Sequence, residues 1–377
     1  MKIIVAPDSF KESLSAEKVA ESIASGILKA VPNAVIEQIP VSDGGEGLLK
    51  ALVKPYGGRL ISAEVLDPLQ KKITAHFGLL NDKKTAVIEM ANASGLELIN
   101  SEERNPLITT TYGTGQLIKA ALDKGCSKII VGLGGSATND GGVGMVQALG
   151  GKFLDKDGNE IGFGGANLQE LHTINLDQLD IRLNNCTIIG ACDVTNPLTG
   201  KNGASMIYGK QKGASPGQQL QLDNALTHYA NIVRKQWNIE IDTVNGAGAA
   251  GGTGAALIGF LQAQLIPGIE LITDQLNLEE KIANADLVIT GEGKIDQQTL
   301  NGKTISGIAK IAKKHHVPVI VIAGSLGENL NKLYEIGISA IFSIVDHPMS
   351  LENALKNSDQ LLQRCSENII RALTIKT

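Results

Sequence analysis

Short apolar runs alternate with helix-like segments at both ends of this chain, and that alternation limits the folds open to it. Near the start, residues 3–6 and 34–39 are predicted strands on either side of a predicted helix over residues 16–30. Near the end, three further predicted strands are separated by helices; they cover residues 286–290, 317–323 and 340–345. Such alternation is typical of a parallel sheet covered by helices on both faces. We therefore predict an α/β fold with a flavodoxin-like, doubly wound parallel sheet of strand order 2-1-3-4-5.

The residues between these two ends follow a different pattern. Three predicted strands form an antiparallel meander; they cover residues 59–64, 72–79 and 85–90. A long amphipathic helix is predicted over residues 218–237. We expect a discontinuous flavodoxin-like domain made of residues 1–60 and 285–377, and a mixed α/β domain inserted as residues 61–284. The active site is expected in the cleft between the two domains.

Composition and charge exclude several classes of protein. A net charge of −5 provides no global basic surface of the kind that binds nucleic acid. No apolar run reaches the ~18 residues of a membrane span, and the apolar run at the N-terminus is too short for a signal peptide. The four cysteines form no C-x-x-C pair, so neither a zinc site nor a disulfide framework is predicted. We predict a cytoplasmic protein that binds neither nucleic acid nor a membrane.

A glycine-dense segment, residues 132–142, lies between a predicted strand over residues 128–131 and a predicted helix over residues 143–149. Backbone N–H groups can converge on an anion in such a turn, and the positive end of the helix dipole adds to the attraction. Glycine also permits close approach of the backbone. We predict an anion-binding loop; its candidate residues are Gly134, Gly135, Ser136, Asn139 and Asp140. A tight turn that needs glycine for steric reasons alone is the other interpretation.

In a doubly wound sheet, ligands bind beyond the carboxyl ends of the strands, at the point where the strand order reverses. The first and third strands of the predicted sheet are neighbours at that point. The residues that follow them are polar; they are Asp8, Ser9 and Lys11 after the first strand, and Glu292, Lys294 and Asp296 after the third. Two separate segments are thus predicted to bring carboxylates, a hydroxyl and two lysines to one crevice. The other interpretation is solvated loop charge, with Asp8 or Ser9 capping a helix.

Two further segments place carboxylates after predicted strands. Asp43 and Glu46 lie in a glycine-rich turn that follows the second strand and leads into a helix, where they could also serve as a helix cap and first-turn acids. Asp193 follows the predicted strand over residues 187–191. It is a candidate general base or metal ligand, and it could equally start a turn, because Asn196 and Pro197 follow closely.

Residues 246–251 match the dinucleotide pattern G-x-G-x-x-G, and Asp274 lies 28 residues beyond the first glycine. The predicted strand before this segment, residues 239–244, contains alternating polar residues, unlike a strand buried on both faces. The glycine pattern nevertheless makes an NAD-dependent dehydrogenase one alternative function. A phosphate-binding start of a helix explains the segment equally well; its candidate residues are Gly251, Gly252 and Thr253.

Other well-known catalytic motifs are missing from the sequence. The phosphate loop G-x-x-x-x-G-K-[ST] has its ending at Gly302, Lys303 and Thr304, but Gln297 replaces its first glycine. The histidines lack the spacing of a zinc hydrolase, and there is no G-x-S-x-G turn. What remains is a set of glycine-rich anion loops, carboxylates and lysines, which is the set that phosphoryl transfer requires.

In the glycine-rich and polar loops described above, the chain resembles the glycerate kinase family that includes the bacterial enzymes of glyoxylate and glucarate catabolism. The matching segments span nearly the whole chain in order; they are residues 6–11, 43–47, 132–142, 192–194, 196–198, 246–254, 286–296, 298–299 and 302–303. The resemblance implies a phosphotransferase with an alcohol group as acceptor. Its expected reaction is ATP-dependent phosphorylation of D-glycerate, in this branch usually to 2-phosphoglycerate. It also implies a flavodoxin-like domain with an inserted α/β domain.

For this reaction we hypothesise roles for individual residues. Lys11 is expected to hold the substrate carboxylate or the transferring phosphate, and either Asp193 or Asp296 to orient the attacking hydroxyl. The expected substrate-binding residues are Asp8, Ser9, Lys11, Glu292 and Lys294. The candidates in the two glycine-rich segments are expected to bind the phosphates of ATP. Mg²⁺ is expected at Asp43, Glu46 or Glu292.

One residue departs from the pattern of the family. Thr195 occupies a position where related sequences often have an acid, so a magnesium site built on that acid would differ here. The expected partners are D-glycerate and ATP, and a homo-oligomer is compatible with these expectations. A non-catalytic sugar-acid-binding protein is the second alternative, because it would use the same cleft without turnover.

Overall fold

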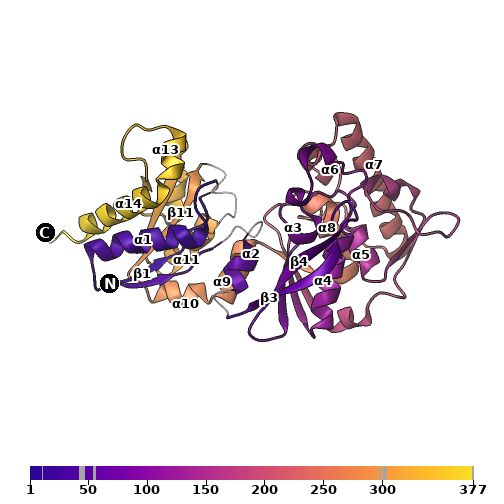
Figure 1. Ribbon diagram of the computed structural model, residues 1–377, viewed down its shortest axis with the longest axis horizontal. Coiled ribbons are helices and arrows are strands. Elements are labelled where there is room, and N and C mark those ends of the chain that lie inside the picture. The colour runs from indigo at the N-terminus through magenta and orange to yellow at the C-terminus, as the bar shows by residue number, and fades with distance from the viewer. Residues whose placement is uncertain (11, 42–46, 54–56, 297–298, 300–303, 376–377) are drawn as a thin grey trace. The chain divides into compact units, whose positions relative to one another are not determined.

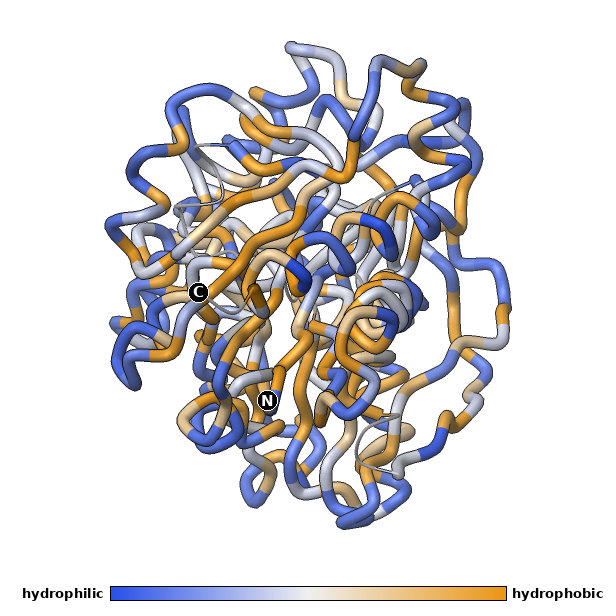
Figure 2. Tube along the Cα trace, turned by 90° about the vertical axis from the view of Figure 1, so that its left-hand side faces the viewer, coloured by the Kyte–Doolittle hydropathy of each residue, from blue (hydrophilic) through white to orange (hydrophobic). Residues whose placement is uncertain are grey.

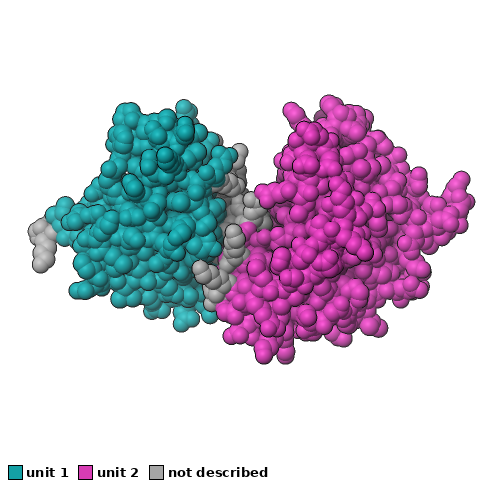
Figure 3. All heavy atoms as spheres, in the orientation of Figure 1, with its two compact units in different colours: residues 1–43, 269–377 teal, residues 44–268 magenta. Residues whose placement is uncertain are grey.

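The computed structural model describes residues 1–10, 12–41, 47–53, 57–296, 299 and 304–375 (Figure 1). The chain forms two compact units (Figure 3). Unit 1 consists of Met1–Asp43 and Ile269–Thr377, and unit 2 consists of Gly44–Gly268. These bounds differ from the 60 and 285 predicted from the sequence. Helix α2 (Leu48–Val53) belongs to unit 2, where the Leu49 backbone N–H donates to a carboxylate oxygen of Glu89 at 2.9 Å.

Unit 1 contains a sheet of five parallel strands in the order β13-β12-β11-β1-β2. The strands are β1 (Lys2–Val5), β2 (Val35–Gln38), β11 (Leu287–Ile295), β12 (Val319–Leu326) and β13 (Ala340–Ser343). Numbered within the unit, this is the order 2-1-3-4-5, so the predicted flavodoxin-like sheet is confirmed. Buried isoleucine and valine side chains fill the central strands, as expected for a parallel sheet covered on both faces.

Seven helices of the described chain fall in unit 1, apart from the first residue of α9; they are α1 (Ala16–Ala30), α9 (Gly268–Gln275), α10 (Leu278–Ala283), α11 (Thr304–Lys314), α12 (Asn331–Glu335), α13 (Leu351–Lys356) and α14 (Ser358–Leu373). Helix α1 begins after Ser15, whose hydroxyl accepts a hydrogen bond from the Lys18 N–H. Its Gly26 lies against α14, because a Cβ there would be 2.1 Å from Oγ of Ser366. The glycine thus allows α1 and α14 to pack closely.

Strand β11 is longer than predicted. The sequence predicts a strand over residues 286–290 followed by a loop, but β11 stays paired with β12 as far as Ile295. Gly291 makes this possible, since a Cβ at that position would be 2.1 Å from the Ile322 carbonyl oxygen. Glu292 and Lys294 therefore lie on a strand and not in a flexible loop.

Unit 2 contains a mixed sheet of six strands in the order β10-β9-β6-β5-β4-β3. The strands are β3 (Arg59–Leu66), β4 (Lys72–Leu79), β5 (Thr85–Glu89), β6 (Lys128–Gly132), β9 (Thr187–Ala191) and β10 (Gln264–Ile266). Strands β3, β4 and β5 are antiparallel, as the predicted meander requires, and β5, β6, β9 and β10 are parallel. A separate antiparallel pair joins β7 (Lys152–Leu154) and β8 (Thr173–Asn175).

The remaining helices of unit 2 are α3 (Ala91–Ser94), α4 (Tyr112–Asp123), α5 (Val143–Ala148), α6 (Ala204–Tyr208), α7 (Pro216–Trp237) and α8 (Ala249–Leu261). They share one core with the sheet, in which Phe77, Phe153 and Tyr229 are fully buried. Figure 2 shows hydrophobic stretches (orange) and hydrophilic stretches (blue) alternating along the chain. No helix in the described residues combines the length and the apolar character that crossing a membrane requires.

The strand predicted over residues 239–244 is wrong. These residues are all described, and they form turns and irregular structure between α7 and α8. Three consecutive residues at the start of α8, Ala250 to Gly252, have positive φ angles. The segment 246–251 therefore does not connect a strand to a helix, which is the structural context that a dinucleotide fingerprint requires. This observation removes the basis of the dehydrogenase alternative.

Candidate functional site

A cavity of about 550 Å³ in unit 1 collects several of the predicted site residues. Those that line it are Asp8, Ser9, Glu292, Lys294 and Asp296. They come from the carboxyl ends of β1 and β11, which are parallel neighbours in the sheet. Leu351 and Leu355 of α13 supply apolar lining. The structure therefore brings two segments together that lie almost 300 residues apart in the sequence.

Hydrogen bonds to several described residues help to hold Asp8 in place. Its backbone N–H donates to the Gly291 carbonyl oxygen at 2.8 Å, which continues the contact between β1 and β11. Its carboxylate accepts from the Ser9 N–H at 2.6 Å and from the Thr304 hydroxyl at 3.1 Å. Thr304 is the first residue of α11. The carboxylate is thus oriented before any ligand binds.

Glu292 and Asp296 are linked through one buried hydroxyl. Thr299, whose side chain is 1% exposed, donates from Oγ1 to Oε1 of Glu292 at 2.7 Å. The same hydroxyl accepts from the Asp296 N–H at 3.2 Å. The Lys294 ammonium lies 3.3 Å from Oδ2 of Asp296. Carboxylates and an ammonium group therefore line one wall of the cavity.

The donor set of this cavity fits magnesium in its usual form. In the part of the chain that the structure describes, no group of three or more His, Cys, Asp or Glu side chains could hold a metal ion. Mg²⁺ is normally held by only one or two carboxylates together with phosphate oxygens and water. Asp8 and Glu292 line the cavity and offer such carboxylates. The predicted residues Lys11, Asp43 and Glu46 lie outside the described residues.

In unit 2, the glycine-rich loop follows β6 and lies beside the residues that follow β9. The two strands are in register up to Gly132 and Ala191. Gly135 and Asp193 are both exposed at this end of the sheet. One carboxylate oxygen of Asp193 accepts from the Gly268 N–H at 2.9 Å, which connects it to the residues after β10. Three parallel strands thus deliver polar groups to the same edge.

Asp140 is almost completely buried, at 1% exposure. Its carboxylate accepts hydrogen bonds from the N–H and the hydroxyl of Thr111 and from the N–H groups of Gly142 and Gly144. Burial raises the pKa of this carboxyl group, and these hydrogen bonds act in the opposite direction. Asp140 therefore ties the glycine-rich loop to the start of α4, and its described contacts are all within unit 2.

The second glycine-rich segment lies beneath the first. The Gly141 N–H donates to the Gly251 carbonyl oxygen at 3.0 Å, and a Cβ on Gly251 would be 2.0 Å from the Thr138 carbonyl oxygen. Gly252 and Thr253 are buried, and the Thr253 hydroxyl donates to the Ala250 carbonyl oxygen. Asn139 is also buried, with its amide donating to the Ser205 hydroxyl at 2.8 Å. Of the predicted cofactor-binding residues, Gly134 and Gly135 are the more accessible.

Sequence reasoning missed three residues that the structure places at these sites. Thr299 and Thr304 orient the carboxylates of the unit 1 cavity. Lys212, which is 2% exposed, donates from its ammonium group to two residues of the glycine-rich loop. The contacts of Thr304 and Lys212 join segments distant in the chain, so the residues around them give no signal for these contacts. Thr299 contacts residues close to it in the chain and lies in a segment that matches the family, but the match does not say what its hydroxyl binds.

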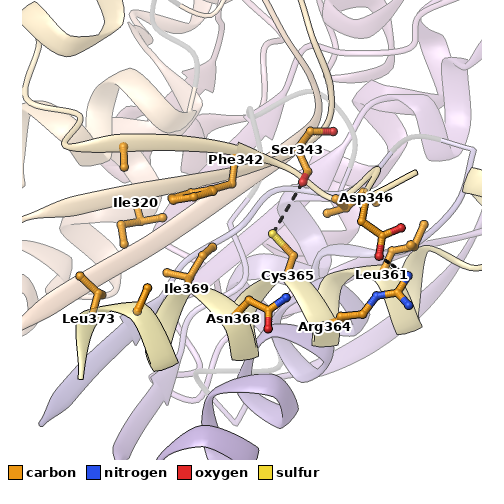
Figure 4. A pocket seen from close by; sticks show the side chains of 13 residues that line it. Ile320, Phe342, Ser343, Asp346, Leu361, Arg364, Cys365, Asn368, Ile369 and Leu373 are labelled. Carbon is orange, nitrogen blue, oxygen red and sulfur yellow. Dashed lines mark hydrogen bonds and ion pairs between the residues drawn. The ribbon is translucent and has the colours of Figure 1, made fainter. Parts of the chain in front are cut away.

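A second cavity in unit 1, of about 320 Å³, lies between β13 and α14 (Figure 4). Its lining is mostly apolar, with Phe342 and Ile369 facing each other across it. Arg364 and Asp346 form an ion pair at one end. Of the predicted site residues that the structure describes, none lines this cavity. Its apolar walls suit an anionic substrate poorly, so the first cavity is the better candidate site.

Comparisons with known proteins agree along the whole chain. Residues 3–374 match the model of the glycerate kinase family. The glycerate 2-kinase of Escherichia coli is 52% identical, with 100% of this chain and 98% of that protein covered. The glycerate kinase of Bacillus subtilis is 49% identical over the same shares of the two chains. A crystal structure of a Salmonella typhimurium LT2 protein, provisionally named glycerate kinase 2, superimposes with a TM-score of 0.89 at 50% identity and covers 99% of this chain and 98% of that one. The chain belongs to the glycerate kinase family.

Proposed function

We propose that this protein transfers the γ-phosphoryl group of ATP to the C2 hydroxyl of D-glycerate and releases ADP and 2-phosphoglycerate. Family membership supports the reaction, and the name of the Escherichia coli relative supports the choice of the C2 hydroxyl. One observation carries the proposal: the unit 1 cavity gathers Asp8, Glu292 and Lys294 at the carboxyl ends of adjacent parallel strands. That position is where doubly wound sheets bind their ligands.

The cavity is suited to a small hydroxy acid. The Lys294 ammonium can attract the substrate carboxylate, and the Ser9 hydroxyl can donate a hydrogen bond to a substrate oxygen. Lys11, which lies outside the described residues, is proposed to hold the substrate carboxylate or the transferring phosphate. Because Thr304 and Thr299 already orient Asp8 and Glu292, little reorganisation is needed when the substrate binds.

In the transfer step, the C2 oxygen forms a bond to the γ-phosphorus while the bond from that phosphorus to the β,γ-bridging oxygen breaks. The hydroxyl proton passes to a carboxylate, and the two candidates are Asp296 and Asp193. Asp296 lines the unit 1 cavity beside Lys294. Asp193 lies at the carboxyl end of β9. An acid that accepts this proton and orients the hydroxyl is a recurring part of phosphoryl transfer enzymes.

The phosphates of ATP are proposed to bind the glycine-rich loop of unit 2, chiefly at Gly134, Gly135 and Ser136. Asn139, Asp140 and the segment 251–253 support this loop from beneath. Magnesium, when bound, would neutralise charge on the phosphates. Its proposed ligands are Glu292, which lines the unit 1 cavity, and Asp43 and Glu46, which lie outside the described residues.

Phosphorus NMR of the reaction product tests the proposal directly. The purified protein is incubated with D-glycerate, ATP and magnesium, and the expected product signal is that of 2-phosphoglycerate. A 3-phosphoglycerate signal would overturn the choice of hydroxyl and leave the kinase reaction in place. Folded protein that yields neither compound would overturn the reaction and favour a non-catalytic sugar-acid-binding protein.

Two variants distinguish the candidate bases. Asp296→Asn and Asp193→Asn each replace a carboxylate by an amide of nearly the same size. The variant that lacks the base should lose at least ~100-fold in kcat, and the other should lose less. Asp157→Asn, on an exposed turn of unit 2, is the matched control and should keep the activity of the unmodified protein.

A further inference from the structure

Lys212 is a buried cation in contact with the glycine-rich loop. It ends a short 3-10 turn, Lys210–Lys212, between α6 and α7. Its Nζ atom donates to Oγ of Ser136 at 2.8 Å and to the Thr138 carbonyl oxygen at 2.6 Å. Two of its three ammonium protons are therefore used to hold one segment of the loop. The side chain is 2% exposed, whereas Lys210 in the same turn is exposed.

Burying an ammonium group is unfavourable unless nearby groups compensate for the lost hydration. Burial lowers the pKa of Lys212 to about 7, while the Asp140 carboxylate acts to raise it. The backbone and Cβ of Arg104 lie against Gly213, the residue after Lys212. Tyr229, on α7, adds a hydroxyl whose pKa is raised well above its ordinary value by burial, so it is neutral. The Lys212 ammonium is thus a buried charge whose lost hydration is only weakly compensated by neighbouring groups.

The segment that Lys212 holds is also anchored through its backbone: the Thr109 hydroxyl donates to the Ala137 carbonyl oxygen at 2.9 Å, and Ser136 pairs with Gly95 in an isolated β-bridge. The Thr138 hydroxyl and the Asn139 side-chain oxygen are buried, and neither has a hydrogen-bond partner within the described residues. The Ala137 N–H donates to the Ser94 carbonyl oxygen, and the Leu96 N–H donates to that of Gly135. Lys212 supplies the side-chain contacts that keep Ser136 and Thr138 oriented.

We infer that Lys212 is a positioning residue for the nucleotide: it holds residues 136–138 in place and supplies the positive charge behind the loop that attracts phosphate groups. This inference rests on the proposed kinase function. A charge in a low-dielectric interior acts over a longer range than one in water, so it raises the affinity of the loop for anions without touching them.

The two contributions of Lys212 respond differently to pH. A neutral amine keeps two N–H donors, so the bonds to Ser136 and Thr138 survive deprotonation. The positive charge does not survive. The charge is present below pH 7 and is lost as the pH rises through about 7. Nucleotide affinity should therefore fall as the pH rises through this range.

Calorimetric binding of Mg-ADP between pH 6 and pH 8.5 tests the inference on the full chain. If binding of the anion raises the pKa of Lys212 by one unit, the affinity of the unmodified protein changes about tenfold over this range. Lys212→Arg keeps the charge at every pH and should give a nearly flat profile. Because the ligand titrates equally in both proteins, the ratio of their affinities isolates Lys212.

Lys212→Met removes the charge but keeps the length of the side chain. It should weaken Mg-ADP binding and raise KM for ATP about tenfold at pH 6.5, while KM for glycerate changes less than about twofold. Lys210→Met removes an exposed charge from the same turn and should bind Mg-ADP normally. Fluorescence of Trp237, the single tryptophan, reports whether unit 2 of each variant is folded.

The inference would be overturned if the affinity for Mg-ADP had the same pH profile in the unmodified protein and in Lys212→Arg. It would also be overturned if folded Lys212→Met bound Mg-ADP normally. If Lys212→Met does not fold, the comparison of the unmodified protein with Lys212→Arg still tests the inference. The failure of the proposed function looks different: folded, unmodified protein would then neither bind Mg-ADP nor phosphorylate glycerate at any pH.

Discussion

Oδ2 of Asp140 lies 2.8 Å from both the backbone nitrogen and the hydroxyl oxygen of Thr111, at the start of α4. The same Thr111 hydroxyl accepts a hydrogen bond from the Met145 N–H in α5. A single buried carboxylate therefore joins the glycine-rich loop to two helices. The loop that is proposed to bind phosphates is held from below by this carboxylate and from the side by Lys212.

Asp140→Asn should destabilise unit 2. An amide nitrogen in place of Oδ2 faces the Thr111 donors and leaves them without an acceptor in the interior. Each buried donor without an acceptor costs about 1–3 kcal/mol, so the free energy of unfolding should fall by about 3 kcal/mol. Urea denaturation followed by the fluorescence of Trp237, which lies in unit 2, measures this change. Asp157→Asn on the surface is the control; an equal loss in both variants would contradict the structural role of Asp140.

Thr299→Val should impair catalysis without unfolding the protein. Valine has nearly the same shape as threonine, but it cannot donate to Glu292 or accept from the Asp296 N–H. A hydrogen bond to a charged group contributes about 1.5–3 kcal/mol, so kcat/KM for glycerate should fall at least ~tenfold. Thr299→Ser keeps the hydroxyl and should retain most of the activity. If steady-state kinetics gave the same kcat/KM for glycerate in Thr299→Val and Thr299→Ser, the role of the Thr299 hydroxyl would be refuted.

Gly26→Ala should destabilise unit 1 although alanine favours helices. The added Cβ would lie 2.1 Å from Oγ of Ser366 and 2.2 Å from the Gln363 carbonyl oxygen, so α1 and α14 must move apart. Overpacking of this kind costs about 1–3 kcal/mol. Gly217→Ala in α7 is the control. Apart from the chain neighbours of Gly217 and the nearby backbone of its own helix, no described atom lies within 4 Å of the added Cβ. Calorimetry should show a lower Tm for the first variant and an unchanged or higher Tm for the second.

The Asp180–Arg182 pair should make the stability of unit 2 vary with pH in the acid range. Hydrogen bonds from Arg182 lower the pKa of Asp180 from 3.8 to about 2. Because the pKa in the folded state is below that of the unfolded chain, the stabilisation is present above pH 3.8 and is lost as the pH falls through about 2. Arg182→Gln should lower Tm at neutral pH, and the difference from the unmodified protein should narrow between pH 4 and pH 2. A difference in Tm that stays constant over this range would contradict the assignment.

Much of the architecture follows from local sequence patterns. The alternation of apolar strands and helices predicted the order of the unit 1 sheet, since parallel strands joined by helices have few allowed arrangements. The meander over β3, β4 and β5 was predictable from its period-two pattern. The strand predicted over residues 239–244 was wrong, because short polar-apolar alternation also occurs in irregular segments where no partner strand is available.

The fold class, the five-stranded order of unit 1 and the candidate segments for chemistry followed from the sequence, because these depend on local periodicity and on residue types at strand ends. Three features emerge from the folded chain: β11 continues to Ile295, Thr299 and Thr304 orient the carboxylates of the cavity, and Lys212 reaches Ser136. The contacts of Thr299 with Glu292 and Asp296 lie within seven residues of it, but the others join segments far apart in the chain. Such contacts are set by how elements pack in three dimensions, and the local pattern around each residue carries no record of them.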